Sequence, residues 1–116
     1  MKSEFEKKAH RAAEAYLMRK GYNVIDPSPR SSAIGFVAKS EEGAVVFISF
    51  AAKAAEDMAP GLPEEPCSRA EMEQAAAEWL GGYEADGDFS VRFDSIAVLA
   101  LGKSRALLRH HKDMLG

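Results

Sequence analysis

The stretch 44–51, AVVFISFA, is almost wholly apolar and rich in β-branched and aromatic side chains. A short apolar run of this kind, bounded by turn residues, predicts a strand that is covered on both faces. Four residues, SEEG (40–43), separate it from a second strand-like run at 33–39. The loop has hairpin length, and Gly43 stands where a positive φ is needed. We therefore expect an antiparallel hairpin at the centre of a sheet.

A helix is predicted on each side of this hairpin along the chain. Over residues 3–20 the apolar side chains recur at helical spacing, and Ser3 with Glu6 has the pattern of a capping box. Ser68 with Glu71 repeats that pattern and begins a second apolar-periodic segment, which ends at two consecutive glycines.

The remaining segments complete the sheet. Residues 22–26, 89–101 and 104–109 are predicted strands, and the proline-rich, acidic stretch 54–66 is a predicted loop. The tail from His110 onward is expected to be frayed. The resulting order is α-β-β-β-α-β-β, a mixed central sheet flanked by helices.

The composition indicates an ordinary globular protein. With 116 residues, 47% hydrophobic and 28% charged, a single domain spanning 1–116 is expected. The net charge of −3 gives no global attraction to phosphate backbones. No apolar run is long enough for a membrane span and no export signal is visible, so a cytoplasmic location is expected. The single cysteine, Cys67, has no partner for a disulfide or a zinc site.

Three segments carry a resemblance to a known family. They are A-x-x-Y-L-x-x-x-G-Y (13–22), VF (46–47) and R-F-D-x-x-A-V (92–98). In order and spacing they resemble the YraN-like family of predicted endonucleases, over nearly the full chain. The resemblance implies a restriction-endonuclease-like α/β fold.

The resemblance also implies where catalytic residues would stand, and the chain departs from the family there. The family has a Gly-Glu-Ile-Asp-Leu-Ile-Ala strand and then Phe-Val-Glu-Val-Lys-Thr-Arg, where this chain has SAIGFVA (32–38) and FISFAAK (47–53). The family aspartate falls on Gly35, its glutamate on Ser49 and its lysine on Ala51. The family's helix glutamate falls on His10.

These replacements predict an inactive family member. A divalent cation in such a site needs carboxylates, and Gly, Ser and Ala supply none. The positions His10, Gly35, Ser49 and Ala51 are therefore interpreted as a degenerate site, with no catalytic residue, no metal and no cofactor. We therefore expect this protein to act as an interaction or regulatory module, and another protein is the first partner to seek. The oligomeric state is not fixed by the sequence.

Two alternatives stay open. In the first, the chain is a Mg²⁺-dependent nuclease whose acids have moved, with Asp26, Asp94 and Glu14 within about 5 Å of one another around a cleft. In the second, the protein binds nucleic acid weakly without cutting it. The candidate contacts are then Arg30, Lys39, Lys53 and Arg69, and the affinity would fall steeply with salt.

Six side chains have structural interpretations. Arg92 and Asp94 lie two apart on one strand, so they share a face and are expected to form a structural pair. Trp79 continues an apolar helical stripe and is expected to anchor the core. His10 is expected to be a surface or half-buried helix histidine. The adjacent His110 and His111 are assigned to the solvated tail, because neighbours on a strand point to opposite faces and cannot share one ion.

Overall fold

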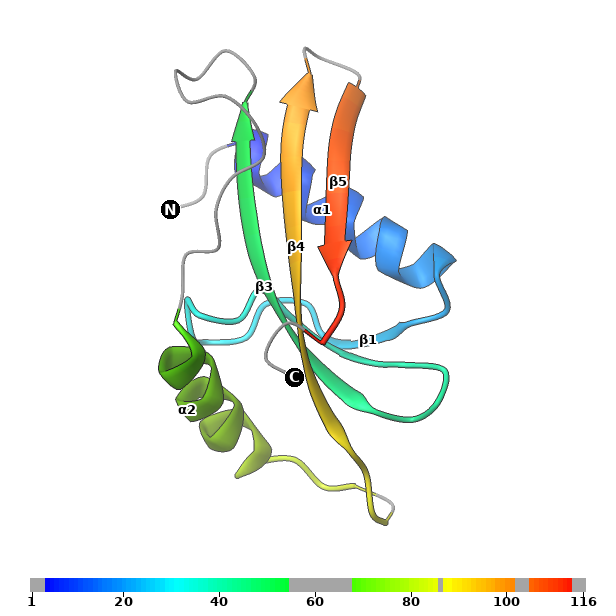
Figure 1. The fold of residues 1–116 in the computed structure, drawn as a ribbon, viewed down its shortest axis with the longest axis vertical. Coiled ribbons are helices and arrows are strands. Elements are labelled where there is room, and N and C mark those ends of the chain that lie inside the picture. Colours follow the sequence, from blue (N-terminus) through cyan, green and yellow to red (C-terminus); the bar gives the residue numbers. More distant parts are fainter. Residues whose placement is uncertain (1–3, 55–67, 86, 102–104, 114–116) are drawn as a thin grey trace.

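The computed structural model describes residues 4–54, 68–85, 87–101 and 105–113. In chain order its elements are α1 (Glu4–Arg19), β1 (Asn23–Asp26), β2 (Phe36–Lys39), β3 (Val45–Ala54), α2 (Arg69–Leu80), β4 (Val91–Leu101) and β5 (Arg105–His111) (Figure 1). The predicted order of helices and strands and the mixed α/β class are confirmed.

The five strands form one sheet in the order β1-β2-β3-β4-β5. β3 and β4 are parallel, and every other neighbouring pair is antiparallel. The parallel connection from β3 to β4 passes through α2, whereas the antiparallel pairs need only short connections. The long strands β3 and β4 run side by side along the length of the molecule (Figure 1).

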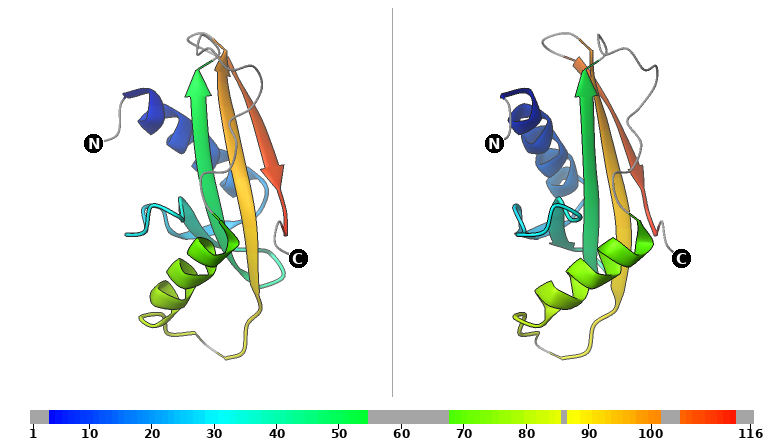
Figure 2. Two further views of the ribbon diagram at one scale, coloured as in Figure 1. Left: turned by 60° about the vertical axis from the view of Figure 1, so that its left-hand side comes forward. Right: turned by 90° about the vertical axis from the view of Figure 1, so that its left-hand side faces the viewer.

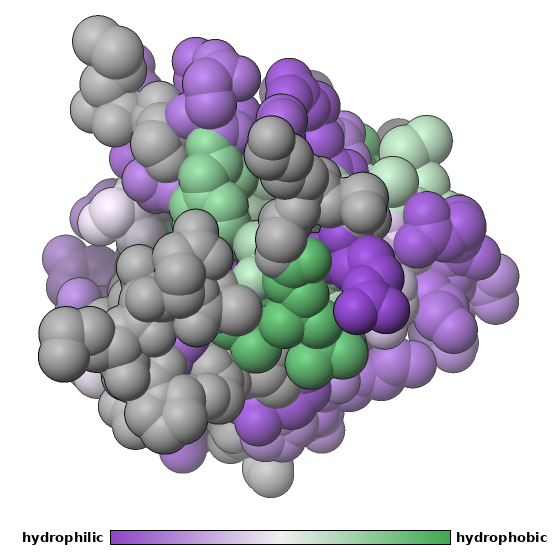
Figure 3. All heavy atoms as spheres, turned by 90° about the horizontal axis from the view of Figure 1, so that it is seen from above, coloured by the Kyte–Doolittle hydropathy of each residue, from purple (hydrophilic) through white to green (hydrophobic). Residues whose placement is uncertain are grey.

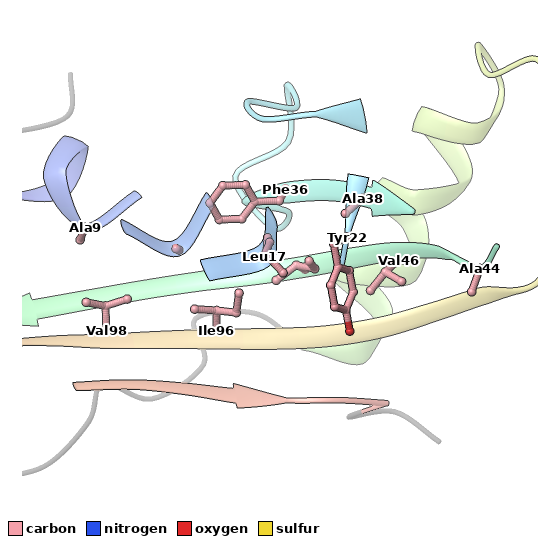
Figure 4. Packing of buried hydrophobic residues seen from close by; sticks show 11 residues of the cluster. Ala9, Leu17, Tyr22, Phe36, Ala38, Ala44, Val46, Ile96 and Val98 are labelled. Carbon is pink, nitrogen blue, oxygen red and sulfur yellow. The ribbon is translucent and has the colours of Figure 1, made fainter. Parts of the chain in front are cut away.

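The side of the sheet that carries α1 holds the larger cluster of buried apolar residues. Ala9, Ala13 and Leu17, one turn apart on α1, pack against Ile48 of β3 and Ile96 of β4. Figure 4 shows Leu17 and other members of this cluster between the helix and the strands. Spacing of this kind is what the apolar stripe in the sequence predicts.

The other side of the sheet carries α2. Val45 and Phe47 of β3 point to it, because side chains alternate along a strand and the intervening Val46 belongs to the α1 cluster. Met72 of α2 is fully buried there, and Trp79 packs at the margin. The helix covers one end of the sheet, on the side away from α1 (Figure 2). The core-anchoring role expected of Trp79 is confirmed.

Two local predictions are confirmed in detail. Gly43 has a φ of +92°, and the hydroxyl of buried Ser40 accepts a hydrogen bond from the Ala44 N–H at 3.1 Å, closing the hairpin loop. At the start of α2, the Ser68 hydroxyl accepts from the Glu71 N–H, and the Glu71 carboxylate accepts from the Ser68 N–H. In both places, polar side chains accept hydrogen bonds from backbone N–H groups that would otherwise lack a hydrogen-bond partner.

The structure differs from the sequence-based expectation at the ends of the strands. β2 begins at Phe36 and not at Ala33, because the Ser31 hydroxyl and carbonyl accept from Ala33 and Ile34 and form a turn. β5 continues through His111 instead of ending at residue 109, so the expectation of a frayed tail at His110 was wrong. The first capping serine, residues 55–67 with Cys67, and residue 104 lie outside the described ranges.

Large apolar side chains reach the surface at separated places. Among the described residues, the exposed ones are Met18, Phe89, Val91 and Leu107. Val91 pairs with the first residue of β3, while Leu107 pairs with Leu99, eight residues farther along β4. Seen from above, hydrophobic residues lie among hydrophilic ones (Figure 3). We interpret these side chains as scattered surface residues and not as one docking face.

Candidate functional site

Two of the four positions on which the family resemblance places catalytic residues are in contact. His10 of α1 lies 3.2 Å from the Gly35 carbonyl oxygen through its Nε2 atom. Its ring stacks on Phe36, with 4.1 Å between the ring centroids, and meets Phe50 edge-on at 5.4 Å. His10 is half-buried, as expected from the sequence. It is held by apolar rings and a carbonyl.

The other two positions point away from His10. Ser49 and Ala51 alternate with Phe50 along β3, so their side chains point to the face opposite α1. Ser49 is 1% exposed, and its hydroxyl oxygen has no hydrogen-bond partner among the described residues. The four positions therefore offer an imidazole on one face and a lone buried hydroxyl on the other.

Position 35 has no room for a side chain on this backbone. A Cβ atom built on Gly35 would lie 2.5 Å from the Cβ of Phe50, closer than unbonded carbon atoms approach. The Gly35 N–H donates to the Ile48 carbonyl at 2.7 Å, which fixes the chain against β3. An aspartate at this position would require the backbone to move.

A hollow of about 410 Å³ borders Gly35 and Phe50. Among the described residues of its lining, Glu6 of α1 is the one carboxylate, and the rest is mainly the serine-rich loop between β1 and β2. Within residues 4–54, 68–85, 87–101 and 105–113, no group of three or more His, Cys, Asp or Glu side chains is arranged to hold a metal ion.

The acids named for a relocated metal site do not come together. The carboxylate of Asp26 accepts a hydrogen bond from Trp79 Nε1 at 3.0 Å, on the α2 side of the sheet. Asp94 lies on the α1 side, where it contacts His110, which in turn contacts Tyr16 of α1. The predicted grouping of Asp26 with Asp94 was wrong, because the two side chains lie on opposite faces.

Asp94 is instead the centre of a buried polar network. Its carboxylate is fully buried and accepts two hydrogen bonds from Arg92, each 2.9 Å long. His110 Nε2 donates to the same carboxylate at 2.7 Å, and the Asp113 N–H donates at 3.0 Å. The pairing of Arg92 with Asp94 expected from the sequence is confirmed. The network also ties the end of the described chain to β4.

Two tyrosines extend the network to the first part of the chain. Arg92 donates to the Tyr22 oxygen at 2.6 Å, and the Tyr16 hydroxyl lies 3.0 Å from His110 Nδ1. Burial, followed by the negative charge of Asp94, raises the pKa of both tyrosines. Both hydroxyls therefore stay protonated at neutral pH. The Tyr16 hydroxyl can donate to His110 whenever the imidazole is neutral.

The ionised form of Asp94 is the stable one in this environment. Burial alone would raise its pKa, but the hydrogen bonds from His110, Arg92 and Asp113 together lower it to about 2. A carboxylate with four donated hydrogen bonds is satisfied, and the network is closed around it. We interpret it as an element of structure.

The sequence contains a signal that predicts the burial of His110. Leu108 packs against the α1 cluster, and His110 follows it by two residues on β5. Extending the alternation by one pair of residues places the imidazole on the buried face and His111 on the exposed one. The side chain of His110 is only 3% exposed.

Two of the four basic residues proposed for nucleic acid lie near opposite ends of β3. Lys39 pairs with Val45 at the start of β3, and Lys53 lies eight residues farther on, roughly 26 Å away at about 3.3 Å per residue. Arg69 begins α2 and lies 3.5 Å from Glu73. Arg30 lies in the loop between β1 and β2. Lys39 and Lys53 therefore do not belong to one cluster, and the role of the four residues in binding nucleic acid stays a prediction.

A pocket that the sequence did not indicate lies between that loop and α2. It encloses about 350 Å³. Its apolar lining comes from Ile34, Val37, Phe47, Ala75 and Trp79, and its polar lining comes from Asp26, Arg30, Ser31 and Glu78, with Pro29 at the loop. Both views in Figure 2 show the cyan loop beside the green helix.

The architecture now defines the class of protein. A five-stranded mixed sheet with helices on both sides, in the order α-β-β-β-α-β-β, is that of the restriction-endonuclease-like α/β proteins. No protein-family profile matches the chain. A UPF0102 protein of Rhodopseudomonas palustris (strain BisA53) is 34% identical over 104 residues, which cover 88% of this chain and 75% of the relative. The chain belongs to the UPF0102 family, which is the YraN-like family.

Neither of the helices within the described ranges combines the length and the apolar character needed to cross a membrane.

Proposed function

We propose that this UPF0102 protein is a restriction-endonuclease-like domain that does not cleave nucleic acid and acts as a cytoplasmic interaction or regulatory module. The observation that carries the proposal is the packing at Gly35. The space that the family's aspartate would occupy is filled by the Cβ of Phe50, 2.5 Å from where a side chain would begin.

The donor set at the neighbouring positions supports the same conclusion. Gly35 and Ala51 have no side-chain oxygen, and Ser49 offers a single buried hydroxyl. Within the part of the chain that the structure describes, Glu6 is the one carboxylate lining the adjacent hollow. Mg²⁺ requires near-octahedral oxygen coordination and is usually held by one or two carboxylates together with substrate oxygens. These residues do not fit that ion, so no catalytic step is assigned to them.

The charge distribution favours a protein partner over nucleic acid. The chain carries 18 acidic and 15 basic side chains. Glu71, Glu73 and Glu78 are exposed along α2. Carboxylates on that surface repel the extended phosphate backbone of a nucleic acid strand. A protein partner has no phosphate backbone, so these carboxylates do not repel it in this way.

The test is a cleavage assay on the full chain with branched, single-stranded and duplex DNA, in Mg²⁺ or Mn²⁺, with and without a chelator. We expect no chelator-sensitive cleavage. Glu6→Gln and Asp26→Asn are the matched variants, because each removes a carboxylate that lines one of the two hollows. Cleavage by the wild type that either variant abolishes would overturn the proposal. Binding without cleavage that weakens steeply with salt would replace the protein partner with nucleic acid.

A further inference from the structure

The pocket between the β1–β2 loop and α2 has the features of a small-molecule site. Its volume of about 350 Å³ is within the usual range for ligand pockets, at the lower end. Its floor is apolar and includes the aromatic rings of Phe47 and Trp79. Polar groups lie around this floor, as they do in sites that orient a ligand.

The indole of Trp79 is held in position. Asp26 accepts a hydrogen bond from Trp79 Nε1 at 3.0 Å, and its other carboxylate oxygen accepts from the Ser28 N–H at 3.1 Å. Phe47 meets the indole edge-on at 5.6 Å, and Tyr83 packs against it at 4.8 Å. A fixed aromatic wall reduces the entropic cost of stacking a flat ligand against it.

The charged groups of the lining indicate what such a ligand must carry. Arg30 is exposed at the loop and supplies a guanidinium, which binds phosphate oxygens in a bidentate manner. Asp26 and Glu78 supply carboxylate oxygens, which accept hydrogen bonds from ring N–H or amino groups. A ligand that combines a flat aromatic ring, N–H donors on that ring and an anionic group is a nucleotide.

We infer that this pocket binds a nucleoside monophosphate, with the base against Trp79 and the phosphate on Arg30. The inference is independent of the proposed loss of cleavage, because Ser49, Ala51 and His10 do not line this pocket. It also does not depend on a protein partner.

The chain provides its own probe. Trp79 is the only tryptophan in the sequence, so its emission reports on this pocket alone. The full chain is titrated with adenosine, cytidine, guanosine and uridine monophosphates, and binding heats are measured in parallel. Three control ligands each lack one feature of a nucleotide. Nucleosides lack the anion, inorganic phosphate lacks the ring, and phenyl phosphate lacks the ring donors. A short oligonucleotide with a 5′-phosphate separates a free nucleotide from a strand end.

We expect saturable emission changes with at least one monophosphate, and weaker binding by nucleosides, inorganic phosphate and phenyl phosphate. Arg30→Ala should weaken monophosphate binding by about tenfold or more, since a charge-assisted hydrogen bond is lost, while nucleoside binding changes little. Arg69→Ala removes a cation from the same side of the molecule outside the pocket, and should leave the affinity unchanged. Saturation by the oligonucleotide alone, with no response to any monophosphate, would identify a strand end as the ligand and overturn the inference.

Equal affinities of wild type and Arg30→Ala for the monophosphates would overturn the inference. Inorganic phosphate that binds with the same affinity as the nucleotides would also overturn it. No emission change and no heat with any nucleotide would also overturn it. Because Arg30 is exposed, its replacement leaves the core intact, and far-UV circular dichroism checks that the variant is folded.

Discussion

His110 Nε2 lies 2.7 Å from an oxygen of the Asp94 carboxylate, and both side chains are buried, at 3% and 0% exposure. They come from neighbouring antiparallel strands, and Arg92 completes the charge balance with two hydrogen bonds to the same carboxylate. A buried charge of this kind is tolerated only when its partners are in place. This relationship gives the first two predictions.

Replacing Asp94 with Asn should destabilise the fold strongly. The substitution keeps the shape but leaves Arg92 and His110 without the carboxylate, and breaking a buried pair in this way costs roughly 3 to 5 kcal/mol. The free energy of unfolding in urea measures the effect. Glu73→Gln is the control, because the Arg69–Glu73 pair is exposed and should contribute less than about 1 kcal/mol. Similar losses in both variants would contradict the account.

The same network should make stability depend on pH in the acid range. The pKa of Asp94 is lower in the folded chain, at about 2, than its ordinary value of 3.8. Its contribution, about 2 kcal/mol, is complete above about pH 4 and is lost as the pH falls toward about 2. The difference in unfolding free energy between wild type and Asp94→Asn should therefore narrow across that window. A constant difference would show that Asp94 does not titrate with folding.

Gly35→Ala should be destabilising although it adds only one methyl group. The new Cβ would lie 2.5 Å from the Cβ of Phe50, so the backbone must shift, at a cost of about 1 to 3 kcal/mol. Gly82→Ala is the matched control, since the nearest atom to a Cβ there is 4.0 Å away. Thermal unfolding of the two variants compares them directly. An Ala at position 35 that is tolerated as well as one at position 82 would remove the main support for the proposed function.

Ser49→Ala should leave stability unchanged or raise it. The hydroxyl is buried and has no partner among the described residues, so its removal relieves an unpaired polar atom. Ser40→Ala is the contrasting variant, because its hydroxyl accepts from the Ala44 N–H and its loss should cost about 1 kcal/mol. Urea unfolding distinguishes the two. A large loss in Ser49→Ala would mean that its hydroxyl has a bound partner.

Much of the fold could be predicted because local signals decide it. The apolar run around Phe47, the positive φ at Gly43 and the capping box at Ser68 each depend on residues close together in sequence. The ends of strands were less predictable. The turn that keeps Ala33 out of β2 is made by the Ser31 side chain and carbonyl, and the apolar pattern alone does not show it.

The sites were harder to predict for a different physical reason. The Asp94 network joins α1, β4 and β5, and Tyr16 and His110 are 94 residues apart. Likewise, the pocket depends on the contact between Asp26 and Trp79, 53 residues apart. Side chains so distant are brought together by sheet order, which follows from all the strands at once. Of these contacts, only the Arg92–Asp94 pair, two residues apart, could be predicted from a local sequence pattern.

The central claim is that the position of the family's catalytic motif no longer holds a metal ion. Calorimetric titration of the full chain with Mn²⁺ tests it most directly, because binding is measured without a substrate. We predict no saturable heat, for the wild type and for Glu6→Gln alike. Stoichiometric Mn²⁺ binding by the wild type that is lost in Glu6→Gln would contradict the account, and would place a working metal site beside Gly35.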